Sequence, residues 1–430
     1  MMTDLTDPNL EINVDLDVQE ILLAASQHDI DKLRELIRSN NGLENPVNVK
    51  DPETGYTPLH AAIAACEPDD APNGVHADDT EQQQQQQQQQ SEQDKVIEAG
   101  RETVKFLLQE GAIWNDLDNN DETPGCLARR LGLTELYELM VDAGVRAELL
   151  FNRLEGYERL PDGEGEGDEE DKEEKEEDNH ATENEAQESQ REASAEESGT
   201  AEVTQPAAAE PDVTNTRYLQ SNLTFQNDRL LDSDQNGVMM AWETDIMAKT
   251  ARKLLPRPGL RALNIGHGMG IVDGFFQEQS PSAHHIVEAH PEVIAEMKRK
   301  GWHEKPGVKI HEGRWQDVLP ALVEQGETFD AIYYDTFAES YADFRQFLSE
   351  HVIGLLDPSG QWGFFNGMGA DRQISYDVYQ KVVEMDLFEA GFDVDWENIP
   401  VPKLEGEWTG VRRPYWVVDN YRLPTCRYMD

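Results

Sequence analysis

The 430-residue chain has little of what marks secreted and membrane proteins. Its three cysteines, Cys66, Cys126 and Cys426, lie far apart without Cys-x-x-Cys spacing, so a disulfide framework and a cysteine-rich zinc site are not expected. No run of about 18 or more apolar residues exists, which excludes a transmembrane helix. The acidic residues 1–15 lack the basic and apolar regions of a signal peptide. These features favour a reducing compartment.

Basic residues are also scarce. The chain has 36 Lys and Arg against 87 Asp and Glu, a formal net charge of −51. Such a surface repels nucleic-acid phosphates and anionic lipid headgroups, and it attracts basic proteins. We therefore expect a basic protein partner, and no direct binding to nucleic acid or to a membrane.

Two low-complexity segments divide the chain. Residues 161–212 contain 21 acidic and three basic residues. They contain few large apolar side chains, so the apolar surface they could bury would not offset the conformational entropy lost on folding. We predict a disordered acidic linker there, either a solvated spacer or a polyanionic lure for basic substrates. Residues 67–95, with nine consecutive glutamines at 82–90, are predicted to be a flexible insertion in a surface loop. The folded units would then be 15–160 and 213–430.

The N-terminal unit has the pattern of paired short helices. Apolar residues in 18–38 recur at helical spacing on both sides of His28. TPLHAA at 57–62 resembles the ankyrin signature, in which Thr-Pro starts the first helix of a repeat. Residues 118–144 resemble the next repeat. The sequence predicts two or three degenerate all-α ankyrin repeats that bind a partner, with His60 in a structural role.

The C-terminal unit begins with the pattern of a nucleoside site. LRALNI at 260–265 is a predicted buried strand, and the glycine-rich GHGMG follows before a predicted helix. The next apolar run ends at Glu288, whose carboxylate can accept hydrogen bonds from ribose hydroxyls. Glycines at this turn let the backbone approach a ligand at the helix N-terminus. The spacing favours S-adenosylmethionine over a dinucleotide.

Further strands complete an α/β sheet. The run 329–337 is a predicted strand that delivers Asp335 to the edge where open α/β sheets bind ligands, and 360–366 is another strand. Residues 392–399 and 415–421 are predicted to pair as a terminal hairpin. The sequence therefore predicts a class I, Rossmann-like, seven-stranded methyltransferase domain after the all-α unit.

Four motifs resemble those of guanidinoacetate methyltransferase: GVMMAWETDIM at 237–247, NIGHGMG at 264–270, EGRWQD at 312–317 and YYDTF at 333–337. The resemblance is closer to the fungal type IV protein arginine methyltransferases, which join ankyrin repeats to such a domain and methylate the δ-nitrogen of arginine. It implies S-adenosylmethionine as methyl donor and a basic protein substrate, with a ribosomal protein as candidate. It also implies nuclear pore association. We further expect a location in cytoplasm and nucleus, and a monomer.

The same resemblance implies that Glu243 and Asp335 face the substrate guanidine and are catalytic. A free guanidinium has a pKa above about 12, so its lone pair is unavailable for attack. Two carboxylates can hold the planar group and accept its proton. The alternatives are a helix-surface carboxylate for Glu243 and a strand-end cap, or a cofactor contact, for Asp335.

The resemblance also supplies the residues expected to line the cofactor. They are Tyr218, Met247, Gly266, His267, Gly268, Met269, Gly270, Ile271, Val272, Glu288, Ala289, His290, Trp315, Gln316 and Asp335. Met247 could instead be ordinary helix core. His284 and His285 are adjacent in a predicted strand, so they point to opposite faces, and no metal site is expected.

Two other functions fit parts of this pattern. A small-molecule guanidine methyltransferase would use the same carboxylates, and a non-catalytic ankyrin adaptor would need only the N-terminal unit. The ankyrin pattern favours a protein substrate, and the intact Glu243, Asp335 and glycine turn argue against the adaptor. We further expect the long linker to let the repeats move independently while they deliver substrate.

Overall fold

In the computed structural model, the described residues are 8–39, 43–68, 79–154, 214–226 and 228–429. The acidic linker predicted for 161–212 lies outside them. Within the described ranges, no helix combines the length and the apolar character that crossing a membrane would require.

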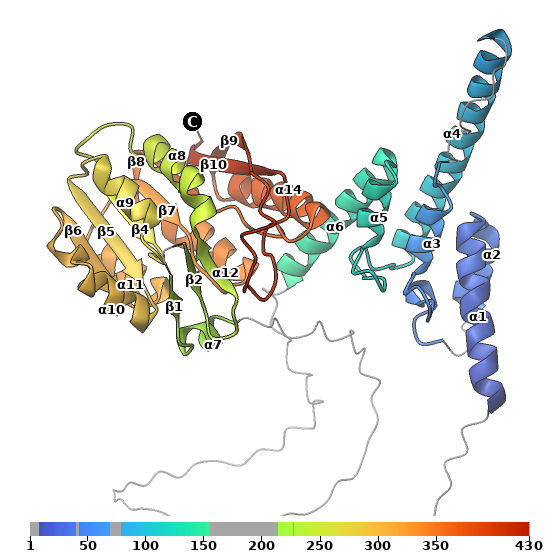
Figure 1. The fold of residues 1–430 in the computed structure, drawn as a ribbon, viewed down its shortest axis with the longest axis horizontal. Coiled ribbons are helices and arrows are strands. Elements are labelled where there is room, and N and C mark those ends of the chain that lie inside the picture. The colour runs from blue at the N-terminus through green and yellow to red at the C-terminus, as the bar shows by residue number, and fades with distance from the viewer. Residues whose placement is uncertain (1–7, 40–42, 69–78, 155–213, 227, 430) are drawn as a thin grey trace, which may run out of the picture.

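The N-terminal unit consists of helices stacked side by side (Figure 1). They are α1 (Pro8–Ser26), α2 (Ile30–Ser39), a 3-10 turn at Pro46–Asn48, α3 (Pro58–Ala64), α4 (Asp79–Gln109), α5 (Pro124–Arg130) and α6 (Thr134–Leu154). The predicted break between the first two falls at His28, where φ is 56°. This region is therefore all-α, as predicted.

The two Thr-Pro sequences begin helices for the expected reason. Thr57 caps α3 by accepting the backbone N–H of His60, whose Nδ1 accepts the Thr57 N–H at 3.2 Å. Thr123 caps α5 in the same way by accepting the N–H of Cys126 at 3.1 Å. His60 is buried, and its Nε2 lies 3.1 Å from the carbonyl oxygen of Glu122. Its role is structural, as predicted.

The glutamine tract differs from the prediction. Helix α4 includes residues 82–90, so these glutamines are helical rather than part of a flexible loop. Glutamine is a good helix former, and the buried Val104 and Leu107 anchor the far end of the same helix in the core. Low complexity was therefore a poor guide to backbone structure here.

The C-terminal unit is built on a seven-stranded sheet in the order β6-β5-β4-β7-β8-β10-β9. Its strands are β4 (Arg261–Ile265), β5 (Ala283–Glu288), β6 (Val308–Glu312), β7 (Phe329–Tyr334), β8 (Leu356–Phe364), β9 (Phe392–Pro400) and β10 (Asn420–Tyr428). The first five are parallel, and β10 runs antiparallel to both β8 and β9. The predicted Rossmann-like class I methyltransferase fold is confirmed.

The terminal hairpin forms, but with a different second strand. Phe392 pairs with Tyr428 and Pro400 with Asn420, so the strand is 420–428 and not the predicted 415–421. The apolar run misled because Trp416 is buried in a separate core cluster, with its Nε1 donating to the Val418 carbonyl at 2.6 Å. This run is buried by packing within a loop, and its apolar pattern alone does not distinguish such a loop from a buried strand.

Helices cover both faces of the sheet, and the side chains of successive strand residues pack against the helices on opposite faces. Ala262 of β4 packs with α8 (Thr244–Leu254), α9 (Ile271–Glu278) and α10 (Pro291–Arg299). Leu263 and Ile265 pack with α11 (Trp315–Glu324), α12 (Tyr341–Gln346), α13 (Val352–Leu355) and α14 (Gln373–Glu389). This alternation is the period of two expected of a strand.

A small antiparallel sheet precedes the main one and was not predicted. It comprises β1 (Thr224–Phe225), β2 (Arg229–Leu231) and β3 (Gly237–Met240), after the short helix α7 (Asn215–Leu219). A 3-10 turn at Ala241–Glu243 then carries the first predicted catalytic carboxylate into α8.

The two units share one apolar core, because α6 packs along α14 (Figure 1). Ile374 and Val378 of α14 are buried there. A Cβ on Gly125 would lie 1.8 Å from Cδ1 of Ile374, and one on Gly144 would lie 2.6 Å from Cγ2 of Val378. The glycines therefore permit close contact between the units.

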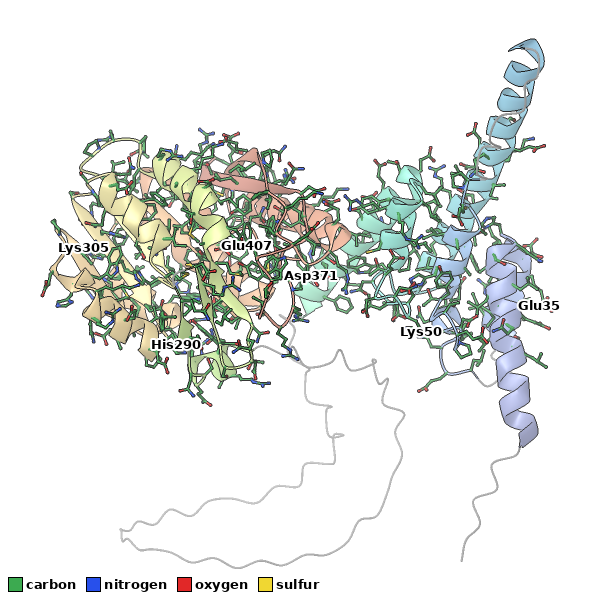
Figure 2. The ribbon with its side chains drawn as sticks, in the orientation of Figure 1. Glu35, Lys50, His290, Lys305, Asp371 and Glu407 are labelled. Atoms are coloured by element: carbon green, nitrogen blue, oxygen red, sulfur yellow. The ribbon has the colours of Figure 1, made fainter. Side chains whose placement is uncertain are left out.

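Polar contacts surround this interface. The Tyr137 hydroxyl donates to Asp377 at 2.6 Å, and Lys381 donates to Asp142 at 2.9 Å. Asp371, at the start of the segment leading into α14, lies where the units meet (Figure 2). The expectation of independently moving units is wrong, since buried residues of α14 belong to the apolar core of the N-terminal unit and polar contacts join the two units around it.

Candidate functional site

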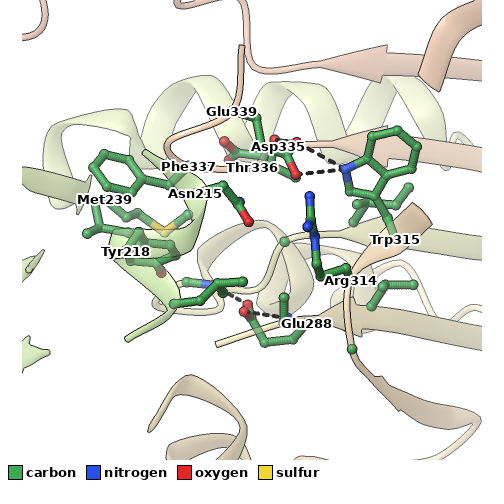
Figure 3. Close-up of a pocket in the computed structure, with 18 residues that line it drawn as sticks. Asn215, Tyr218, Met239, Glu288, Arg314, Trp315, Asp335, Thr336, Phe337 and Glu339 are labelled. Carbon is green, nitrogen blue, oxygen red and sulfur yellow. Dashed lines mark hydrogen bonds between the residues drawn. The ribbon is translucent and has the colours of Figure 1, made fainter. Parts of the chain in front are cut away.

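The carboxyl ends of β4, β5 and β7 surround an open cavity of about 590 Å³. Open α/β sheets bind ligands at this edge, where the strand order reverses. Figure 3 shows Glu288, Trp315 and Asp335 around a common space. The predicted cofactor residues that line the cavity are Tyr218, Gly266, Gly268, Glu288, Ala289, Trp315 and Asp335.

The glycine turn brings the backbone to the cavity wall. Gly266 has a φ of +93°, and a Cβ there would lie 1.9 Å from the carbonyl oxygen of Asp335. Gly268 has a φ of +54°, and its Cβ would lie 2.8 Å from Cε of Met239. Both positions combine a left-handed backbone with a close neighbour, so only glycine fits them without strain.

Glu288 ties the glycine turn to the end of β5. Its Oε2 accepts the backbone N–H groups of His267 at 2.8 Å and of Gly268 at 3.4 Å. Its Oε1 accepts those of Ala289 at 2.8 Å and of His290 at 2.7 Å. The Gly268 contact is long, so Oε2 keeps capacity to accept a hydroxyl from a ligand in the cavity.

Eight predicted cofactor residues do not line the cavity. They are Met247, His267, Met269, Gly270, Ile271, Val272, His290 and Gln316. Met247 and Val272 lie in the apolar core with α8 and α9, which matches the alternative raised for Met247. The resemblance therefore identified the glycine turn correctly, but only some of the residues it implied line the cavity.

A buried polar network supports the turn from behind. Asp273 of α9 accepts from Asn264 at 2.8 Å and contacts His267 Nδ1 at 2.6 Å and His284 Nε2 at 2.8 Å. Burial alone would raise the pKa of Asp273, but the two histidine contacts lower it to about 2. His284 and His285 lie in one strand, as predicted, and His285 instead contacts His311 at 3.2 Å.

Asp335 lies between two cavities at the end of β7. One is the cavity already described, and the second, of about 380 Å³, also shares Thr336 and Glu339. Burial, followed by the charge of Asp273, raises the pKa of Asp335 to about 7. Its Oδ2 has no hydrogen-bond partner among the described residues. The carboxyl group of Asp335 therefore has a pKa near neutral pH, and its Oδ2 is available to accept a hydrogen bond from a ligand.

Glu243 lies behind this edge, at the end of the 3-10 turn before α8. It is 3% exposed, and the hydroxyl of Tyr415 donates to its Oε1. Burial, followed by the charge of Asp335, raises the pKa of Glu243 well above its ordinary value. The two predicted catalytic carboxylates are thus brought within electrostatic reach of each other.

Several residues at these cavities were not predicted. Glu339 accepts from Trp315 Nε1 at 2.9 Å and from the Thr336 hydroxyl at 2.7 Å, and so holds both walls. Met239, Thr336 and Arg314 could have been found, because they lie inside or beside the quoted motifs. Glu339 and Tyr415 have no such local signal. The described residues include no cluster of three or more His, Cys, Asp or Glu side chains suited to a metal ion.

Known proteins resemble the chain over almost its full length. A family model described as guanidinoacetate N-methyltransferase matches residues 214–404. Protein arginine N-methyltransferase 2 of Aspergillus fumigatus is 71% identical, over 97% of this chain and 98% of its own length. The proteins of that name from Aspergillus oryzae and Neurospora crassa are 71% and 48% identical, over 99% and 96% of this chain and 100% and 96% of their own lengths. The chain belongs to the protein arginine N-methyltransferase 2 family.

The predicted family is thereby confirmed. The chain is a methyltransferase, and S-adenosylmethionine is its methyl donor, as the motifs indicated. A solved precorrin-6y C5,15-methyltransferase from Geobacter metallireducens superposes with a TM-score of 0.31 at 16% identity, over 43% of this chain and 88% of that one.

The cavity fits this cofactor. The glycine turn leaves room for a ligand against the backbone, and Glu288 keeps acceptor capacity for ribose hydroxyls. Trp315 lines the cavity, and its Nε1 donates to Glu339. The unpartnered Oδ2 of Asp335 is an acceptor for a polar group that enters between the two cavities.

Proposed function

We propose that the protein transfers a methyl group to the δ-nitrogen of arginine residues in protein substrates. The single observation that carries the proposal is the carboxylate pair, the buried Glu243 and the half-buried Asp335, which lines a cavity that fits the methyl donor. The names of the relatives support arginine as the substrate residue. Choice of the δ-nitrogen rests on the resemblance to the type IV enzymes.

The carboxylate pair suits a guanidinium. Without a cation, burial and then the charge of Asp335 raise the pKa of Glu243, and burial and then the charge of Asp273 raise that of Asp335. A guanidinium between them would favour the ionised forms and would be held by charge-assisted hydrogen bonds. Binding of arginine would therefore also charge the site.

The raised pKa of Asp335 suits proton transfer. S-adenosylmethionine, when bound, supplies a methyl group on a positively charged sulfur. The guanidinium must lose a proton as its nitrogen attacks, and a carboxylate whose pKa is raised to about 7 before the guanidinium binds is a stronger proton acceptor than an ordinary Asp. In this proposal Oδ2 of Asp335 accepts the proton, and Glu243 holds the remaining N–H groups in the attacking orientation.

The second cavity suits the rest of an arginine side chain. Aromatic and apolar residues line it beside Asp335: Tyr334, Phe344, Phe364, Phe365 and Met368. These walls can cover the aliphatic carbons while the guanidinium reaches the carboxylate. We place the substrate side chain there.

The N-terminal unit favours a protein substrate over a metabolite. We propose that its helix pairs, each Thr-Pro helix capped in the same way, are degenerate ankyrin repeats that contact the substrate protein. We further propose a basic substrate, with a ribosomal protein as candidate, nuclear pore association, a monomer, and a location in cytoplasm and nucleus. The net charge of −51 supports the basic partner.

Mass spectrometry of methylarginine isomers tests the proposal. The full chain is incubated with isotopically labelled S-adenosylmethionine and basic cell proteins, and in parallel with guanidinoacetate and free arginine. Label in δ-methylarginine of proteins supports the proposal. Label only in ω-methylarginine would refute the choice of nitrogen, and label only in the small molecules would favour the metabolite enzyme.

A further inference from the structure

The segment 401–419, between β9 and β10, covers the buried end of the active site. Three backbone hydrogen bonds, each 2.8 Å long, hold it. Val401 donates to Asp419, Arg412 donates to Gln235 in the turn between β2 and β3, and Val417 donates to Ala370 in the loop after β8. The first bond joins the two ends of the segment, and the other two fix it to the turn before β3 and to the loop after β8.

Tyr415 within this segment is held on all sides. Trp242 Nε1 donates to its hydroxyl at 3.1 Å, and the Trp408 ring meets it edge-on at 4.9 Å between centroids. A Cβ on Gly237 of β3 would lie 2.9 Å from Cε1 of the Tyr415 ring. The ring fits there because position 237 has no side chain.

The Tyr415 hydroxyl donates to Glu243, which is 172 residues away in sequence. Glu243 also accepts the backbone N–H of Met240, so one donor comes from its own turn and the other from the covering segment. We propose that Tyr415 is a positioning residue for Glu243. Its hydroxyl holds the carboxylate in the orientation that receives the substrate guanidinium, and the segment 401–419 thereby becomes part of the active site.

The direction of the effect on Glu243 follows from the groups that face it. These are Asp335 and Tyr333 from β7 and its end, Tyr421 from β10, and Tyr415. The charge of Asp335 raises the pKa of Glu243, while the Tyr415 hydrogen bond stabilises the ionised form and lowers it. Removing that hydroxyl should therefore raise the pKa of Glu243 further.

Infrared titration tests this without relying on catalysis. The protonated-carboxyl band of Glu243 is the band that Glu243→Gln removes, and it is followed with pH in wild type and in Tyr415→Phe. We expect its midpoint to move to higher pH by about one unit or more, because a hydrogen bond to a charged group is lost. Tyr137→Phe is the matched control, since it removes a Tyr–carboxylate bond at the unit interface. An unchanged midpoint in Tyr415→Phe overturns the proposal.

Kinetics supply a second readout, which rests on the proposed function. Tyr415→Phe should lower kcat for arginine methylation about tenfold at neutral pH and leave cofactor affinity unchanged. In the plot of kcat against pH, the rise on the acid side should move to higher pH. Gly237→Ala keeps the hydroxyl but displaces the ring, and should act in the same direction. Equal loss at every pH, with no shift of the acid limb, would mean a merely structural Tyr415. If wild type methylates no arginine, the proposed function fails, and the infrared result still decides the role of Tyr415.

Discussion

The ionised form of Asp335 should destabilise the folded protein at alkaline pH, compared with a neutral Asn at the same position. Its pKa is about 7 in the folded state against an ordinary 3.8, so between these values the folded state binds more protons than the unfolded state. The free energy of unfolding therefore falls as pH rises through this window, and the loss is complete above pH 7. At about 1.36 kcal/mol per pKa unit, this corresponds to roughly 4 kcal/mol.

Water in the cavity reduces this figure. Because Asp335 lines an open cavity, we expect about half, or roughly 2 kcal/mol. Asp335→Asn is nearly isosteric and neutral, and it also removes the charge that raises the pKa of Glu243. At pH 8 the variant should be more stable than wild type by roughly 2 kcal/mol, or about 4–8 °C in Tm for a unit of this size. At pH 5, where the unfolded state has already lost most of this proton, the gain should fall to about two-thirds of its value at pH 8.

Calorimetric unfolding at both pH values measures the effect, and methyl transfer should be lost in the same variant. Asp371→Asn is the control, because that side chain is 53% exposed and its replacement should change stability by no more than about 0.5 kcal/mol. A variant that gains nothing at pH 8, or gains equally at both pH values, would show that burial of a charged Asp335 is not the cause.

Two other changes test the cofactor turn and the unit interface. Gly266→Ala places a Cβ 1.9 Å from the Asp335 carbonyl oxygen, so calorimetry should show loss of S-adenosylmethionine binding. Gly274→Ala is the control, because nothing lies within 4 Å of the added Cβ, and it should bind the cofactor normally. An unchanged Kd for Gly266→Ala would contradict the argument that this turn has no room for a side chain. Deleting residues 1–154 uncovers Ile374 and Val378, so Tm should fall and methylation of a short peptide should fall along with that of a whole protein. Intact peptide activity in that deletion would show that the units work independently.

The catalytic sheet could be predicted because its central strands are continuous apolar runs that end in turns. The strands ending at Ile265, Glu288 and Tyr334 are the clearest cases. Once the strands are parallel, their carboxyl ends must share one edge, which brings the glycine turn, Glu288 and Asp335 together. Local pattern and topology were sufficient for this part of the site.

Long-range packing could not be predicted in the same way. Tyr415 reaches Glu243 only because the segment 401–419 folds back over the turn after β3, and no local pattern records that return. The apolar run that begins at Tyr415 was predicted to be a strand because burial in this folded-back loop gives the same apolar pattern as burial in a sheet. Glu339 likewise gains its role from Trp315, which lies 24 positions earlier in the chain.

The interface between the units was missed for a related reason. Gly125 and Gly144 gave no sign that each faces an apolar residue of α14, because the signal lies in the partner helix. The acidic linker suggested freedom of movement, since only its composition was considered. Linker length says nothing about whether the units it joins also pack together.

The turnover of Glu243→Gln tests the central claim most directly, because the change keeps the shape of the side chain and removes its charge. Single-turnover methylation of a protein arginine is compared with wild type, and S-adenosylmethionine affinity is measured by calorimetry on the same samples. The carboxylate-pair mechanism predicts a loss of about 10²-fold or more in the rate, with cofactor affinity little changed. A near-normal rate in this variant would contradict it.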